Sequence, residues 1–131
     1  MLPRDRRVRT AADFQHIRRT GARAGRRSLV VTATADPNDT RSGGPSTPRH
    51  PRAGFVVSKA VGVAVVRNRV KRRLRAIMAE QMRRPPLEGQ PLLIQVRALP
   101  AAAEADYATL EKDLAGALRQ AVRKCTANGA A

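Results

Sequence analysis

The feature that most constrains how this chain folds is a run of cationic residues that is interrupted by apolar residues at helical spacing. Six of the nine residues from Arg67 to Arg75 are cationic, and no acidic residue follows before Glu80. A helix over residues 63–82 would step about 100° per residue and gather its apolar side chains on one side. These side chains are Val63, Val66, Val70, Leu74 and Ile77. Because like charges this close repel in an isolated helix, the pattern predicts a core on one face and a polyanion on the other.

Arginine suits a face that binds phosphates. Each planar guanidinium can grip a phosphate with two hydrogen bonds, and each neutralised phosphate releases counterions. Asn68 stands among the charges and could bond a sugar hydroxyl, a base edge or a metal-bound water. A helical face that is only solvated normally mixes charges of both signs. The sequence therefore favours a polyphosphate-binding helix.

The composition points to the same class of partner. The chain has 131 residues and a formal charge of +16, of which residues 1–75 carry +15. This length fits one domain, and the charge favours nucleic acid over an acidic membrane or an acidic protein. Aromatic residues are only 2%, so a binder dominated by base stacking is disfavoured. One cysteine excludes an internal disulfide, and the absence of a long apolar run or signal predicts a soluble, cytoplasmic protein without a membrane partner.

Hydrophobic periodicity and turn residues predict an α+β fold with helices packed on a small sheet. We expect a basic arm over 1–10, a single RNA-binding domain over 11–124 and a tail over 125–131, with a flexible Pro/Gly/Ser loop at 36–51. The expected helices cover 11–20, with Thr10 as N-cap and Gly21 after its end, 63–82, and 104–124. The expected strands cover 27–35, 53–58 and 92–96. The last helix should bury one apolar stripe: Tyr107, Leu110, Leu114, Ala117, Leu118, Ala121 and Val122.

No catalytic arrangement is evident. The two histidines, His16 and His50, lie in a helix and in the Pro-rich loop, and no nucleophile elbow or paired carboxylates occur. Cysteine and histidine are too few for a four-ligand zinc site, and there is no Walker loop or GxGxxG motif. We therefore expect no catalytic residue, no protein-bound metal and no small-molecule substrate.

The stretch from Val57 to Arg75, VSKAVGVAVVRNRVKRRLR, resembles the signature of the bacterial ribonuclease P protein subunit, including its Arg-Asn-Arg core. Shorter pieces agree with it: Leu2 with the Arg-rich arm, Asp13-Phe14 followed by Gly21, Gly54-Phe55, and Pro100 before the Tyr107 helix. The resemblance covers nearly the whole chain except the 36–51 loop and the tail.

This resemblance implies a mainly antiparallel sheet of about four strands in the order α-β-β-β-α-β-α, with an unusual left-handed crossover. The residues themselves predict only three strands, so the fourth is not placed. The resemblance also implies that a large RNA, with bound Mg²⁺, hydrolyses precursor tRNA to give the mature 5′ end. The protein would bind that RNA and the 5′ leader of the precursor without being catalytic alone.

The resemblance also implies two sets of site residues. Contacts to the catalytic RNA would come from Arg67, Asn68, Arg69, Lys71, Arg72 and Arg75. The groove for the single-stranded leader would be lined by Phe14, Arg18, Thr32, Val57 and Lys59. The family often has aromatics where Arg18 and Thr32 stand, a lysine at Ala60 and an asparagine at Val63. Leader binding in this chain should therefore depend more on charge than on stacking.

Three other functions stay open on the sequence. A ribosomal or ribosome-assembly RNA-binding protein would explain the charge, the size and the basic helix equally well. A DNA-binding helix-turn-helix protein is disfavoured because a strand, and not a helix, precedes Gly62. A protein nuclease acting alone would need catalytic residues that the sequence does not offer.

Overall fold

The computed structural model describes residues 7–8, 10–36, 50–85, 87 and 89–129, with side chains up to Thr126. Three α-helices, one 3₁₀ helix and four strands follow one another along the described chain. They are α1 (Ala11–Thr20), β1 (Ala22–Gly25), β2 (Leu29–Ala35), β3 (Arg52–Val56), α3 (Ala64–Met82), β4 (Leu92–Ala98), η2 (Pro100–Ala103) and α4 (Tyr107–Gly129). This order confirms the predicted α+β class.

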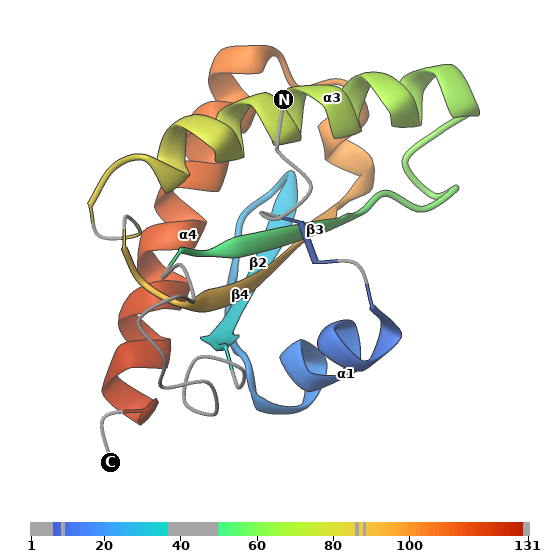
Figure 1. Ribbon diagram of the computed structural model, residues 1–131. Helices are drawn as coiled ribbons and strands as arrows, with labels where there is room; N and C mark the ends of the chain where they lie inside the picture. The colour runs from blue at the N-terminus through green and yellow to red at the C-terminus, as the bar shows by residue number, and fades with distance from the viewer. Residues whose placement is uncertain (1–6, 9, 37–49, 86, 88, 130–131) are drawn as a thin grey trace.

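The four strands form one mixed sheet in the order β1-β2-β4-β3. β2 pairs antiparallel with both β1 and β4, whereas β3 runs parallel to β4 at the other side. The chain passes from β3 to the parallel strand β4 through α3. Figure 1 shows α1 below the sheet and α3 above it. The two helices therefore present separate surfaces on opposite sides of the sheet.

The fourth strand, which the sequence does not place, is β1. Its residues, Ala-Arg-Ala-Gly, have little intrinsic preference for a strand. It forms because its backbone pairs with β2, from Ala22 opposite Ala33 to Gly25 opposite Val30. Residues 22–25 alone do not predict a strand, because the segment becomes one only by pairing with β2.

The first helix has the predicted limits. The Thr10 hydroxyl oxygen accepts a hydrogen bond from the Asp13 amide at 3.1 Å, and this caps the first turn of α1. The helix ends at Thr20, after which the Gly21 N–H donates to the Ile17 carbonyl at 2.8 Å. The N-terminal arm lies outside the described residues except for Arg7, Val8 and Thr10. The Val8 N–H donates to the Ala53 carbonyl at 2.9 Å, so this piece of the arm borders β3.

Two members of the predicted apolar stripes are wrong. Val63 is 70% exposed, because it is the extended N-cap of α3 and the helical rotation begins only after it. Tyr107 is 41% exposed, because α4 begins at this residue, not at 104, and its first turn lies at the rim of the core. The helix also continues to Gly129, beyond the expected end at Lys124. Of the predicted 36–51 loop only Asp36, His50 and Pro51 are described.

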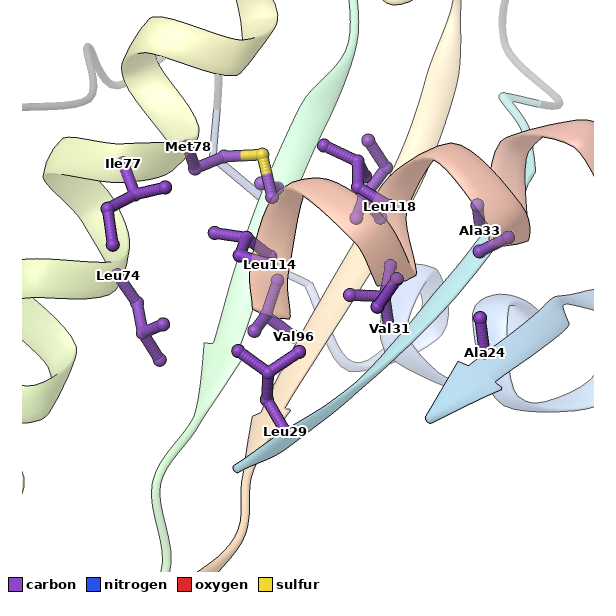
Figure 2. Close-up of a cluster of buried hydrophobic side chains, with 14 of the residues drawn as sticks. Ala24, Leu29, Val31, Ala33, Leu74, Ile77, Met78, Val96, Leu114 and Leu118 are labelled. Atoms are coloured by element: carbon purple, nitrogen blue, oxygen red, sulfur yellow. The ribbon is translucent and has the colours of Figure 1, made fainter. Parts of the chain in front are cut away.

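The main core lies between the sheet and the helix pair α3 and α4. Figure 2 shows Leu74, Ile77 and Met78 from α3 facing Leu114 and Leu118 of α4, above strand residues such as Leu29, Val31 and Val96. The remaining predicted stripe of both helices is thus confirmed as core. A smaller cluster on the opposite face joins Val8, Ile17 and Leu93, with Phe14 packed against it. That small cluster holds α1 to the sheet.

Candidate nucleic-acid interface

The outer face of α3 carries the basic run that the sequence predicts. Val70, Leu74 and Ile77 are buried, and a rotation of about 100° per residue then turns the side opposite to them away from the core. Four predicted RNA contacts project there or on its margin: Asn68, Lys71, Arg72 and Arg75. None of the four side chains makes a hydrogen bond or ion pair to another described residue. Their polar groups are therefore available to an outside partner.

The other two predicted RNA contacts are partly engaged within the fold. Arg67 donates its Nε–H to the Gly62 carbonyl at 3.2 Å, and Arg69 donates from Nη2 to the Ala103 carbonyl at 3.4 Å. A neighbouring arginine that was not in the predicted set, Arg73, donates from Nη1 to the Ala105 carbonyl at 3.3 Å. Each guanidinium has five N–H groups, so these bonds orient the side chains and leave donors for phosphate.

The start of α3 adds positive potential to this surface. Its first turn contains no acidic residue, and Val63 provides no side-chain cap. The amide dipoles of the first turn are therefore not neutralised by a carboxylate. A turn precedes the helix, in which Gly62 adopts a φ of 154° and donates its N–H to the Lys59 carbonyl at 3.2 Å. The exposed Lys59 lies at this turn, beside the basic end of the helix.

A second feature, a groove of about 490 Å³, lies between α1 and the end of β3. It is lined by Ala11, Phe14, Arg18, Phe55, Val56 and Val57. The groove depends on the glycine at position 54. A Cβ atom there would lie 2.5 Å from Phe14 Cζ, so only glycine lets the aromatic ring rest on β3 at this place. The floor and the wall of the groove are therefore set by one contact between distant segments.

Ion pairs and hydrogen bonds fix α1 against the sheet. Arg52 of β3 lies 3.5 Å from an oxygen of Asp13 and 3.1 Å from an oxygen of Asp36. At the other end of α1, the hydroxyls of Thr20 and Thr34 are 2.8 Å apart. Because Asp13 precedes Phe14 in the chain, its ion pair also restrains the ring beside the groove. These contacts within the protein therefore shape the groove before any ligand binds.

The structure brings three of the five predicted leader contacts together, since Phe14, Arg18 and Val57 all line the groove. Thr32 lies on the same face of the sheet but is only 5% exposed, because the end of α1 covers it. Lys59 is exposed but is not part of the lining. The expectation that Thr32 itself contacts a leader is therefore not supported by its position.

Sequence reasoning missed Arg97. This residue lies in β4 directly between Val30 of β2 and Val56 of β3, on the face that α1 occupies. It is exposed in a strand whose other members are all buried, and its side chain makes no hydrogen bond or ion pair to another described residue. The sequence pattern that could have identified it is a single charged residue within an otherwise apolar strand. Arg97 extends the groove across the open part of the sheet.

Known proteins resemble this chain over nearly its whole length. A family model described as Ribonuclease P matches residues 2–122. The chain belongs to the ribonuclease P protein family. It is 69% identical over 123 residues to the ribonuclease P protein component of Micrococcus luteus, covering 94% of this chain and 92% of that protein. It is 49% identical over 120 residues to that of Streptomyces avermitilis, with 92% and 94% covered.

Solved structures of ribonuclease P proteins share the fold. The protein from Staphylococcus aureus superposes with a TM-score of 0.72 at 28% identity, covering 88% of this chain and 94% of that one. The protein from Thermotoga maritima has the same fold, with a TM-score of 0.65 at 24% identity over 89% of this chain and 96% of that one. These matches support the ribonuclease P interpretation and not the ribosomal one. The family is the protein component of an endoribonuclease that is a ribonucleoprotein, so its partner is RNA.

Within the described ranges, no group of three or more His, Cys, Asp or Glu side chains could hold a metal ion. No helix there is long and apolar enough to cross a membrane. Burial raises the pKa of the Cys125 thiol, which makes it a poorer nucleophile.

Proposed function

We propose that the exposed cations of α3 bind the catalytic RNA, while the groove beside α1 binds the single-stranded 5′ leader of precursor tRNA. The observation that carries this proposal is the separation of the two surfaces on opposite sides of one sheet. Asn68 and Arg72 are exposed on α3, and Phe14 lines the groove beside α1. Figure 1 shows α3 above the sheet and α1 below it. One small domain could then contact both RNAs at the same time.

The groove suits a single strand of variable sequence. Phe14 offers one ring for stacking, and the half-buried Val56 offers apolar contact. Arg18 and Arg97 provide positive charge at the wall and on the open sheet. Binding that combines one stacked base with charge along the backbone makes little demand on base identity. This is the chemistry that a leader of changing sequence requires.

The protein's charge would also lower the magnesium requirement of cleavage. We assign hydrolysis and the binding of Mg²⁺ mainly to the RNA subunit, as the resemblance to ribonuclease P implies. Cationic side chains reduce the repulsion between two polyanions that must approach each other. We place this work in the cytoplasm, within one RNA-binding domain over residues 11–124 and with the basic arm adding charge.

The first test is cleavage of a precursor tRNA at low Mg²⁺ by the protein alone, by a bacterial ribonuclease P RNA alone and by both together. Correct 5′ cleavage is expected only in the combination. If the folded protein does not improve on the RNA alone, the proposal fails and general RNA binding replaces it. Cleavage by an RNA-free preparation would indicate a protein nuclease.

Variants then separate the two surfaces. Arg72→Ala should weaken assembly with the RNA, whereas Arg123→Ala removes the same charge from an exposed position of α4 and should not. Phe14→Ala should weaken binding of precursor tRNA but not of mature tRNA. Phe14→Leu should have an affinity for precursor tRNA between those of the wild type and Phe14→Ala. Equal effects of Arg72→Ala and Arg123→Ala would mean that only net charge matters.

A further inference from the structure

The start of α4 lies against the basic helix. Arg69 of α3 donates to the Ala103 carbonyl at 3.4 Å, and one turn later Arg73 donates to the Ala105 carbonyl at 3.3 Å. The segment from η2 to α4 is therefore laid along one flank of α3. Tyr107 follows only two residues after Ala105, so its Cα lies within about 7 Å of that contact.

The backbone at Tyr107 is fixed at this place. The Asp106 carboxylate accepts a hydrogen bond from the Thr109 amide at 2.8 Å, and the Leu110 N–H donates to the Asp106 carbonyl at 3.0 Å. Both bonds fix the first turn of α4, of which Tyr107 is the first residue. An aromatic side chain on a fixed turn loses little entropy when it binds a partner.

The ring of Tyr107 is available to a partner. The residue is 41% exposed, and its hydroxyl makes no hydrogen bond to another described residue. The large exposed apolar side chains of the described chain are Val63, Val65 and Tyr107. Two of them belong to the start of α3 and the third to the segment that is bonded to its flank. The large exposed apolar groups of the described chain thus belong either to the start of α3 or to the segment that is bonded to it.

The chemistry beside Tyr107 fits RNA. Arg69 and Arg73 lie on the flank of α3 that bonds this segment, and Arg72 follows on the adjoining outer face, whereas the connection itself carries two acids, Glu104 and Asp106. An aromatic ring beside guanidinium groups is the usual arrangement by which proteins stack on an unpaired base while holding its phosphates. A protein partner with an acidic surface would use the cations but would not require the ring.

We propose that Tyr107 stacks on an unpaired base of the catalytic RNA, so that the RNA-binding surface extends from α3 onto the first turn of α4. This inference rests on the proposed function of α3. It differs from a packing role, in which the ring would only cover the rim of the core above Leu110. The two roles are separated by replacing the ring with an aliphatic side chain that still covers the rim.

Tyr107 is its own reporter, because the chain contains one tyrosine and no tryptophan. Intrinsic tyrosine emission therefore reports on this ring alone. The full-length protein is titrated with a bacterial ribonuclease P RNA, and the emission lifetime is followed together with binding by filter retention. The control is a double variant, Tyr107→Phe with Thr126→Tyr, which moves the reporter to an exposed position near the other end of α4. Stacking should shorten the lifetime in the wild-type protein and leave that of the control unchanged.

Binding measurements give the second readout. Tyr107→Leu should weaken RNA binding by about fivefold or more, which corresponds to the lower range for loss of one stacked base. Tyr107→Phe should bind nearly as well as the wild type. Because stacking releases no counterions, the salt slope of Tyr107→Leu should equal that of the wild type, whereas Arg72→Ala should have a shallower slope.

The inference is overturned if the wild-type protein binds the RNA with an unchanged tyrosine lifetime, or if Tyr107→Leu binds as tightly as the wild type. In both cases the function proposed for α3 stands. If the wild-type protein neither binds the ribonuclease P RNA in preference to an unrelated RNA nor assists its cleavage, the proposed function itself is wrong.

Discussion

The contact between Gly54 and Phe14 gives the sharpest test of the groove. An added methyl group at position 54 would lie 2.5 Å from Cζ and 2.6 Å from Cε1 of the ring. Carbon atoms prefer a separation of about 3.5–4.0 Å, so the ring would have to retreat by about 1 Å or more. Overpacking of this kind costs about 1–3 kcal/mol. Gly54→Ala should therefore lower the free energy of unfolding by that amount and displace the groove wall.

A double-mutant cycle tests whether the ring is the cause. In a Phe14→Ala background the two nearest obstructing atoms are absent, and the third, the Val8 Cβ, lies 3.1 Å from the new methyl group. The cost of Gly54→Ala should then shrink by about 1 kcal/mol or more, a coupling typical of residues in contact. Urea denaturation of the four proteins measures this coupling.

Gly25→Ala is the matched control, because the nearest atom to its new methyl group would be Val30 Cγ2 at 3.9 Å. It carries the same change in the unfolded chain without the clash, so its effect should stay within about 0.5 kcal/mol. Gly54→Ala should also lower the preference of the holoenzyme for precursor over mature tRNA. An equal loss of stability with and without the Phe14 ring would refute the packing argument.

Three further predictions concern single side chains. Arg72→Ala should reduce the slope of log affinity for the RNA against log salt by about 0.7–0.9. Arg73→Ala should mainly lower the free energy of unfolding, because Arg73 already bonds the Ala105 carbonyl. Equal salt slopes in the two variants would contradict this prediction. Gln95 is 4% exposed and its Oε1 has no partner among the described residues, so Gln95→Met should raise the free energy of unfolding by about 1 kcal/mol or more in a urea titration, and a loss would mean that the amide has a role. The hydrogen bond from Thr109 lowers the pKa of Asp106 below its ordinary 3.8. The ionised carboxylate therefore contributes to the free energy of unfolding above that pH, and the contribution is lost as the pH falls through the lower pKa of the folded state. Asp106→Asn should therefore show a flatter acid limb in thermal melts, and an unchanged limb would exclude the cap as its source.

The leader groove could be predicted only in part. Its members come from α1, from β3 and, with Arg97, from β4, and no local pattern shows that these segments meet. The resemblance pointed to Phe14 and Arg18, which do line the groove. It also pointed to Thr32, which α1 covers. Arg97 could have been suspected from its lone charge, but its neighbours depend on strand register.

The sequence by itself determined the basic helix and the family. An amphipathic period and a single-sign outer face are local properties, since neighbours along a helix are set by its own rotation. For this reason the limits of α1 and nearly those of α3 were predictable, as was the burial of Val70, Leu74 and Ile77. The long signature from residue 57 to 75 is likewise read without knowledge of the fold.

Only the tertiary structure decided which cations are free and what stands beside them. Arg72 and Arg73 are adjacent in sequence and equal in charge, yet only Arg73 meets a carbonyl of the segment before α4. The same packing gives β1 its partner strand and leaves Tyr107 at the rim of the core. These outcomes depend on contacts between residues far apart in the chain. Such contacts are fixed by how whole elements pack together, and the local preferences of the residues do not specify them.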